Sequence, residues 1–273
     1  MNKVLCSTGT FIGTVNNFDY RLIEQYAGIL DCDGLEMMVE PFWNDELGEI
    51  AGYLARRRLG FCSLHADKSI GDLLSRNGEG DLAEALRRFE LNCMAADKIG
   101  AGLLVLHLWG GAASDKNIDF NLKVYGDLLE IARGYGVVIT VENVVCNTRD
   151  ALAHLCALHK IYAHDAKFII DVRHAEFHKN LRETCEAGHL WPNVLHTHIS
   201  DYKGGRMDWA KLRPVLRPGA GDVDFTYFFG FLRRIKYGGW LALEAGARNA
   251  DGTAVDFGKI NESLGFIHRN LRG

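Results

Sequence analysis

Six residues that can bind metals or move protons each stand at the end of a short apolar run. The runs FCSLH, LLVLH, VVITVE, AKFIID, VLHTH and WLALE end at His65, His107, Glu142, Asp171, His198 and Glu244. Imidazole and carboxylate groups ligate divalent cations and act as general acids or bases. Taken singly, each of them can equally cap a turn or begin a helix. Six in succession indicate one shared site, provided that the runs end at the same place in the fold.

Metal chemistry follows from the charges of these residues. Carboxylates a few ångströms apart cannot all stay ionised unless a cation lies among them. A set of three carboxylates and one imidazole consists mostly of hard oxygen donors, which suit Mn²⁺, Mg²⁺ or Co²⁺ and are also compatible with Zn²⁺. We therefore expect one divalent metal ion at the site.

The apolar runs recur eight times, with amphipathic segments between them. They cover Val4–Ser7, Gly34–Met38, Gly60–Leu64, Leu103–His107, Val137–Glu142, Lys167–Asp171, Val194–His198 and Trp240–Glu244. Between the runs, Leu82, Ala85, Leu86, Phe89, Cys93 and Ala96 repeat at spacings of three and four, as on one face of a helix. Apolar strands alternating with helices predict a parallel sheet, and eight such units favour a closed barrel.

The sequence thus predicts an α/β fold, a single (β/α)8 TIM barrel of one domain over residues 1–273. In such a barrel every strand directs its carboxyl end to the same face, where active sites form. The six strand-end side chains would meet there. Residues two apart on a strand share a side, so Thr140 faces the same way as Glu142, and His196 the same way as His198.

Composition excludes several other classes of protein. The chain is 48 % hydrophobic and 24 % charged with a net charge of −4, and it lacks the basic stripe of a nucleic-acid binder. No uncharged run approaches the length of a membrane span, and we find no signal peptide at the N-terminus. The seven cysteines are scattered and include no C-x-x-C pair, which favours a reducing cytoplasm. The sequence does not determine the number of subunits, and a homo-oligomer is one of the options.

Several segments, taken in order, resemble one known family. They are SLHA around His65, DKIGAGLLVLHLWGG through His107, VEN at Glu142, IIDVRHA from Asp171, HTHISD at His198, RPGAGDVDF near Gly219 and YGGWLALEA before Glu244. The set is similar to the xylose-isomerase-like barrels, and the resemblance covers nearly the whole chain. That family includes sugar-phosphate isomerases, ketohexose 3-epimerases, hydroxypyruvate isomerases, inosose dehydratases and the endonuclease IV type of DNA-repair enzyme.

The resemblance implies a role for each matching residue. It implies a metal ion held by Glu142, Asp171, His198 and Glu244. It implies substrate binding by His174, which would contact a substrate oxygen, and by His65 and His107, which would line the sugar pocket; in the endonuclease IV type these three positions ligate zinc. It leaves His196 as a buried neighbour with a structural role. Glu36, near the end of the second strand, could join the site or could equally pair with a lysine or arginine below it.

The implied reaction is proton transfer next to a carbonyl group in carbohydrate metabolism. The substrate would be a small sugar, keto-sugar or sugar phosphate, and the metal would stabilise an enediolate as a Lewis acid. Glu142 and Glu244 would remove and return the proton. Return on the opposite face gives an epimerase, and transfer to the neighbouring carbon gives an isomerase.

Two positions differ from the family pattern, and they limit which reaction and which substrate the resemblance implies. The endonuclease IV type carries a D-x-H pair before the glycine-rich turn, whereas here Asp208 has no such histidine after it, which disfavours DNA repair. Ketohexose epimerases carry an arginine six residues past the metal histidine, and here that residue is Gly204. Lys203 or Arg206 could substitute for it, or the substrate could differ. The runner-up is a metal-dependent dehydratase of a polyol or dehydroshikimate-like acid, and a non-catalytic barrel is a third alternative.

The segments that could cover the site are 66–80 and 200–224, both expected as loops after strands. Four aromatic residues could stack on a sugar ring, with core packing as the alternative for each: Trp43, Trp109, Phe177 and Trp209.

Overall fold

The computed structural model describes residues 2–272, and within them eight parallel strands pair in chain order as a closed barrel. The strands are β1 (Val4–Ser7), β2 (Gly34–Met38), β3 (Phe61–His65), β4 (Leu103–Leu106), β5 (Val138–Glu142), β6 (Phe168–Asp171), β7 (Val194–Ile199) and β8 (Trp240–Leu243). Each lies within one residue of its predicted bounds. The predicted (β/α)8 TIM barrel is therefore confirmed.

Helices follow the strands, as the amphipathic segments predicted. They are α1 (Leu22–Ala27), α2 (Leu47–Ala55), α3 (Ser69–Arg76), α4 (Asp81–Ile99), α5 (Ile118–Gly134), α6 (Ala151–Tyr162), α7 (Val172–Phe177), α8 (Leu181–Glu186), α9 (Phe225–Arg234) and α10 (Phe257–Arg272). The long helix α4 ends at Gly100, which has a positive φ of 77°. Glycine adopts this left-handed conformation without steric cost, so it ends the helix.

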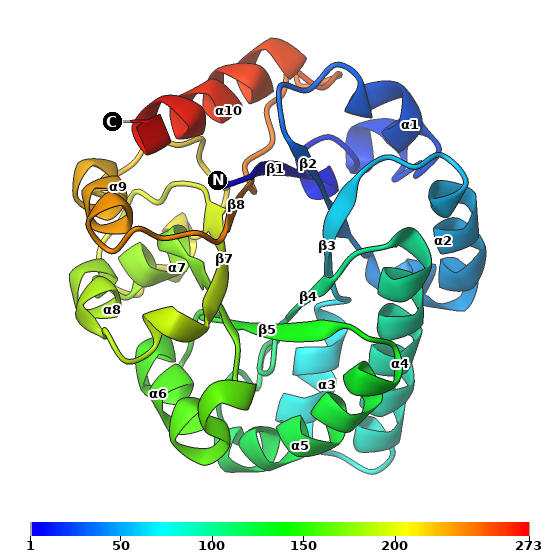
Figure 1. Cartoon of the computed structure of the whole chain (residues 1–273), viewed down its shortest axis with the longest axis vertical. Helices are drawn as coiled ribbons and strands as arrows, with labels where there is room; N and C mark the ends of the chain where they lie inside the picture. Colours follow the sequence, from blue (N-terminus) through cyan, green and yellow to red (C-terminus); the bar gives the residue numbers. More distant parts are fainter. Residues whose placement is uncertain (1, 273) are drawn as a thin grey trace. The chain divides into compact units, whose positions relative to one another are not determined.

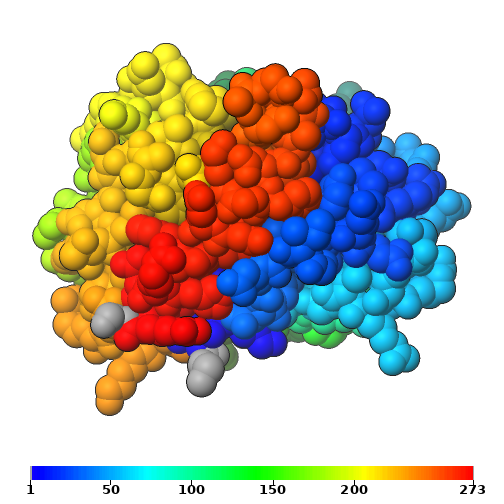
Figure 2. Space-filling view, turned by 90° about the horizontal axis from the view of Figure 1, so that it is seen from above, coloured from blue at the N-terminus to red at the C-terminus, as the bar shows by residue number. Residues whose placement is uncertain are grey.

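Contacts within the chain divide it into two compact units, which are described in turn. The first holds the residues up to Glu36 and those from Ile170 onward. In it, β8 pairs with both β7 and β1, and β1 pairs with β2. Helix α10 packs on β1 and β8 (Figure 1). Figure 2 shows α10, in red, lying along the N-terminal segment in blue, where the Asn261 side chain accepts from the Asp31 amide and donates to the Ile29 carbonyl.

The second unit is Met37–Ile169, in which β4 pairs with β3 and β5. Helix α4 packs against α2 and α3 (Figure 1). The expectation of a loop over 66–80 was wrong for its middle part, because α3 occupies Ser69–Arg76. A side chain at Gly71 would place its Cβ 2.6 Å from the His107 carbonyl oxygen. This glycine lets α3 pack directly on the backbone that follows β4.

Two further findings concern the described part of the chain. No helix in it has the length and apolar character required to cross a lipid bilayer. All seven cysteines carry free thiols, and Cys6, Cys93, Cys146 and Cys185 are buried.

Candidate functional site

The six strand-end residues keep the positions that the sequence predicted. His65, Glu142 and Asp171 are the last residues of their strands, His107 and Glu244 follow theirs directly, and His198 is the penultimate residue of β7. They fall into two groups, one in each compact unit. Asp171, His198 and Glu244 belong to the first unit, and His65, His107 and Glu142 to the second. His174, on α7, also lies in the first unit.

In the first unit, Asp171, His198 and Glu244 form a group suited to a metal ion. Each offers one ligand atom, and these atoms lie within 4.8 Å of one another. Ligands about 2.0–2.2 Å from one cation can be no more than roughly 4.4 Å apart, so small side-chain shifts suffice to close on an ion. Asp171 and His198 are fully buried, and the Glu244 side chain is 9 % exposed. The donors therefore fit a divalent cation in both spacing and chemistry.

Asp171 is oriented by the helix that it begins. Its Oδ1 accepts hydrogen bonds from the backbone amides of Arg173 (2.6 Å) and His174 (3.1 Å) and so caps α7. Such caps stabilise the first turn of a helix and fix the side-chain rotamer. The second oxygen, Oδ2, lies 3.6 Å from His174 Nδ1. One carboxylate thus divides its two oxygens between the helix and the candidate site.

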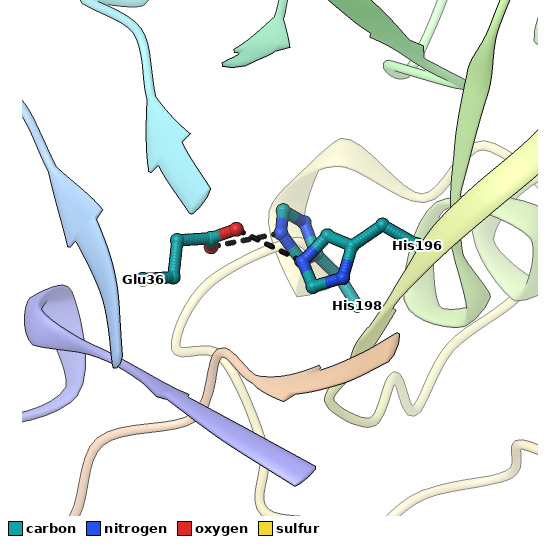
Figure 3. A group of neighbouring side chains, drawn as sticks. All are labelled: Glu36, His196 and His198. Atoms are coloured by element: carbon teal, nitrogen blue, oxygen red, sulfur yellow. Dashed lines mark hydrogen bonds and ion pairs between the residues drawn. The ribbon is translucent and has the colours of Figure 1, made fainter. Parts of the chain in front are cut away.

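His198 is oriented by Glu36, which extends from β2 toward β7 (Figure 3). The Glu36 carboxylate lies 2.9 Å from Nε2 of His198 and 2.9 Å from Nε2 of His196. A carboxylate only accepts hydrogen bonds, so Nε2 of each ring carries a proton. Nδ1 of His198 then presents its lone pair, and it lies 3.5 Å from Glu244 Oε2. This is the tautomer that a metal ligand needs.

The surroundings of Glu36 keep its carboxyl group ionised. Burial alone would raise the pKa of Glu36, but the neighbouring His198 and the two imidazole hydrogen bonds hold it well below its usual range. Burial lowers the pKa of His196 below its usual value. His196 is fully buried, and its hydrogen bond to Glu36 satisfies Nε2 there. Its expected structural role beside the site agrees with this position.

We expect the Glu36→Gln variant to bind Mn²⁺ about 10–100-fold more weakly, because loss of a hydrogen-bond partner behind a metal histidine typically has this effect. The amide can accept from only one of the two imidazoles, so His198 loses its fixed tautomer. The measurement is the Mn²⁺ dissociation constant by calorimetry. Glu49→Gln, on the exposed side of α2, is the matched control. Unchanged affinity in a folded Glu36→Gln protein would contradict this role.

His174 is also held by its neighbours. Arg173 Nη2 donates to His174 Nε2 across 2.7 Å, which leaves the ring proton on Nδ1, facing Asp171. Arg173 is itself buried, and its Nη1 donates to the Leu212 carbonyl at 3.4 Å. The sequence reading passed over Arg173, although its place between Asp171 and His174 in the motif D-V-R-H was a signal that could have drawn attention to it.

In the second unit, Glu142 lies against two predicted histidines. Its Oε2 is 2.6 Å from His107 Nε2 and 3.5 Å from His65 Nε2. His65 Nδ1 lies 2.9 Å from the Ala66 carbonyl, which can only accept, so Nδ1 carries a proton and this hydrogen bond fixes the ring with Nε2 toward Glu142. Burial lowers the pKa of His107 to about 4 against the opposing charge of Glu142, so the ring is neutral at pH 7. Because a carboxylate only accepts, Nε2 of His107 carries a proton and donates to Glu142, and the charge of Glu142 suits a cation or substrate hydroxyl groups.

The four candidate aromatic residues differ in position. Trp109 and Phe177 are fully buried, and Trp43 is 6 % exposed, so all three pack in the core. Trp209, in contrast, is 46 % exposed, with its ring 5.0 Å from that of Phe177. Of the four, Trp209 alone retains an exposed ring face of the kind that could stack on a sugar.

Comparison with known families gives one match that covers most of the chain. Residues 25–267 match the family described as xylose isomerase-like TIM barrel. Among curated proteins, the uncharacterized protein MJ1311 of Methanocaldococcus jannaschii is 24 % identical over 179 residues, which are 59 % of this chain. The chain spans only 58 % of the length of that relative.

Solved structures of the same fold are similar along nearly the whole chain. D-allulose 3-epimerase from Methylomonas sp. is 18 % identical, with 99 % of this chain and 98 % of that one covered and a TM-score of 0.72. The 3-keto-D-glucoside 4-epimerase YcjR from E. coli is 18 % identical, with 98 % and 100 % covered and a TM-score of 0.67. The IOLI protein, solved with a zinc atom, is 15 % identical, with 98 % and 97 % covered and a TM-score of 0.70.

Proposed function

Because the chain belongs to the xylose isomerase-like TIM barrel family, we propose that it is a divalent-metal-dependent isomerase or epimerase of a small sugar, keto-sugar or sugar phosphate. The observation that carries the proposal is the group of Asp171, His198 and Glu244, whose ligand atoms lie within 4.8 Å of one another. The epimerases among similar solved structures support the sugar class. The family match extends through both compact units, which supports one domain over the whole chain.

In this proposal Glu142 supplies the fourth ligand. Its place as the last residue of β5 corresponds to that of Asp171 at the end of β6, and its match to the family motif supports the assignment. A bound Mn²⁺, Mg²⁺, Co²⁺ or Zn²⁺ would polarise the carbonyl and hydroxyl oxygens of the substrate. The zinc atom in the IOLI structure is consistent with a metal site in this family, without fixing which metal this chain takes.

The side chains of this chain move the proton. One of the two carboxylates, Glu142 or Glu244, removes a proton from the carbon next to the carbonyl, and the other returns it. His65, His107 and His174 contact substrate oxygens. The neutral state of His107 suits it to accept or donate a hydrogen bond there without adding charge.

The free thiols of the seven cysteines agree with the proposed cytoplasmic location, where thiols stay reduced.

Deuterium exchange tests this function. The Mn²⁺-loaded protein, incubated in D₂O with a panel of free and phosphorylated ketoses, is expected to place one deuterium on a carbon next to the carbonyl of at least one sugar. Mass spectrometry and proton NMR identify the carbon. Loss of water with formation of a double bond would instead identify the dehydratase. If no sugar of the panel exchanges a proton and none is converted, the proposal is refuted.

A further inference from the structure

The segment that follows β7 is rich in positive charge. Between 202 and 217 it reads YKGGRMDWAKLRPVLR, with one acidic residue, Asp208, against five basic ones: Lys203, Arg206, Lys211, Arg213 and Arg217. The whole chain has a net charge of −4, so this is a local reversal of the average. A concentration of one sign of charge attracts ligands of the other sign.

Both ends of this segment are fixed by one carboxylate. Asp201 accepts hydrogen bonds from the backbone amides of Tyr202, Gly219, Gly221 and Val223 at 2.8–3.1 Å. Asp201 itself is buried. The basic side chains are therefore carried by a loop whose two ends are held at a defined place beside the end of β7.

Part of the loop lines an open surface pocket of about 430 Å³, which we call the loop cavity. Lys203, Lys211 and Arg213 line it, with Asp222 as the acidic residue of the wall. Three cations and one carboxylate leave the cavity positive. A volume of this size is within the range of small-ligand sites, and it exceeds what a phosphate or carboxylate group needs.

One residue of the positive wall, Arg213, lies within range of the charge of the candidate metal ligand Glu244. Arg213 is near enough to Arg173 and Glu244 for both charges to act on it, and its pKa is lowered, chiefly because its guanidinium is partly removed from water. Arg173 holds this part of the loop through the Leu212 carbonyl and contacts His174 with the same guanidinium. Arg173 thus links the backbone beside Arg213 to His174, one of the candidate site residues.

Ketohexose epimerases carry an arginine at the position of Gly204, whereas in this chain other residues of the loop supply the positive charge. A Cβ at this position would lie 2.5 Å from Tyr202 Oη and 2.9 Å from Lys211 Cβ, closer than real Cβ contacts come. No side chain fits there, so the arginine that ketohexose epimerases carry at the corresponding position has no room in this chain. Lys203, Lys211 and Arg213 provide positive charge around that glycine instead.

We propose that the substrate of this chain carries an anionic group, a phosphate or a carboxylate, which Lys203, Lys211 and Arg213 bind while the reacting carbons lie at Glu244. This inference rests on the proposed function and names its substrate class. Arginine forms paired hydrogen bonds with phosphate and carboxylate oxygens, and lysine acts on them as a point charge.

Binding of three sugars to the Mn²⁺-loaded protein tests the inference: D-fructose, D-fructose 6-phosphate and D-glucuronate. Calorimetry is expected to give at least tenfold tighter binding for one of the charged sugars than for D-fructose, and the better of the two identifies phosphate or carboxylate. Arg213→Gln is expected to remove most of this preference, measured as the ratio of the dissociation constants of D-fructose and the charged sugar. Arg269→Gln, an exposed position on α10, is the charge-matched control and is expected to keep the preference.

Equal binding of all three sugars, or a preference that survives both Arg213→Gln and Lys203→Gln, overturns the inference. Deuterium exchange on free ketoses separates this failure from a failure of the proposed function. If neutral sugars exchange and charge brings no preference, the sugar enzyme stands without the anionic subsite. If no sugar exchanges, both proposals fall.

Discussion

The Glu244→Gln and Glu142→Gln variants are expected to fold normally and to lose turnover by a factor of about 10²–10⁴, the range that general acid–base groups contribute. Glutamine keeps the shape of the side chain and an oxygen that can face a cation, but it can neither take nor give a proton at pH 7. Turnover is measured on whichever sugar exchanges deuterium, at saturating Mn²⁺.

A second measurement and a control variant complete this test. The Mn²⁺ dissociation constant of each variant separates loss of the proton-transferring group from loss of the metal. Glu49→Gln, an exposed carboxylate on α2, controls for the charge change and is expected to retain full turnover. Full turnover in either the Glu142 or the Glu244 variant refutes the acid–base role of that residue.

Removal of divalent cations is expected to abolish activity and to lower stability. Without a cation, Asp171 and Glu244 place two carboxylates within 4.8 Å of each other in a nearly dry environment, where like charges destabilise the fold. An ion present at about 100 times its dissociation constant stabilises the native state by about 2.7 kcal/mol. For a chain of this size we expect the melting temperature to rise by roughly 5–10 °C on loading with metal.

The experiment compares protein dialysed against EDTA with the same protein after addition of Mn²⁺ or Co²⁺. Turnover and melting temperature should both return with either ion. Ca²⁺, a larger ion that prefers more ligands, serves as the control and is expected to restore less of both. Full turnover after exhaustive chelation would contradict the metal assignment.

The sequence predicted the strands and their end residues well because both depend on local patterns. Apolar runs of four to six residues and their polar ends are visible without knowledge of the fold, and the eight runs matched the strands within one residue. Helix α3 was missed, because its eight residues include Gly71, and a short helix with a glycine has a weak pattern.

The partners of the site residues were harder to foresee. Glu36 was expected either to join the site or to pair with a lysine or arginine, whereas it binds His196 and His198. Glu36 is about 160 positions away from the two histidines in the sequence. Contacts of this kind depend on how distant strands are arranged in three dimensions, which a local pattern does not show. Arg173 was overlooked for a different reason: the family motif draws attention to the aspartate and histidine on either side of it.

Asp201 has a consequence for how this protein can change. Four backbone amides converge on it, and a backbone amide is present whatever side chain a residue carries, proline excepted. Mutations at Lys203 and between 205 and 215, with Gly204 left unchanged, can therefore alter the chemistry of the loop while its attachment persists. Selection for new substrates can therefore change the side chains of this loop without changing the rest of the fold. A library randomised at these positions should yield altered specificity more often than it yields unfolded protein.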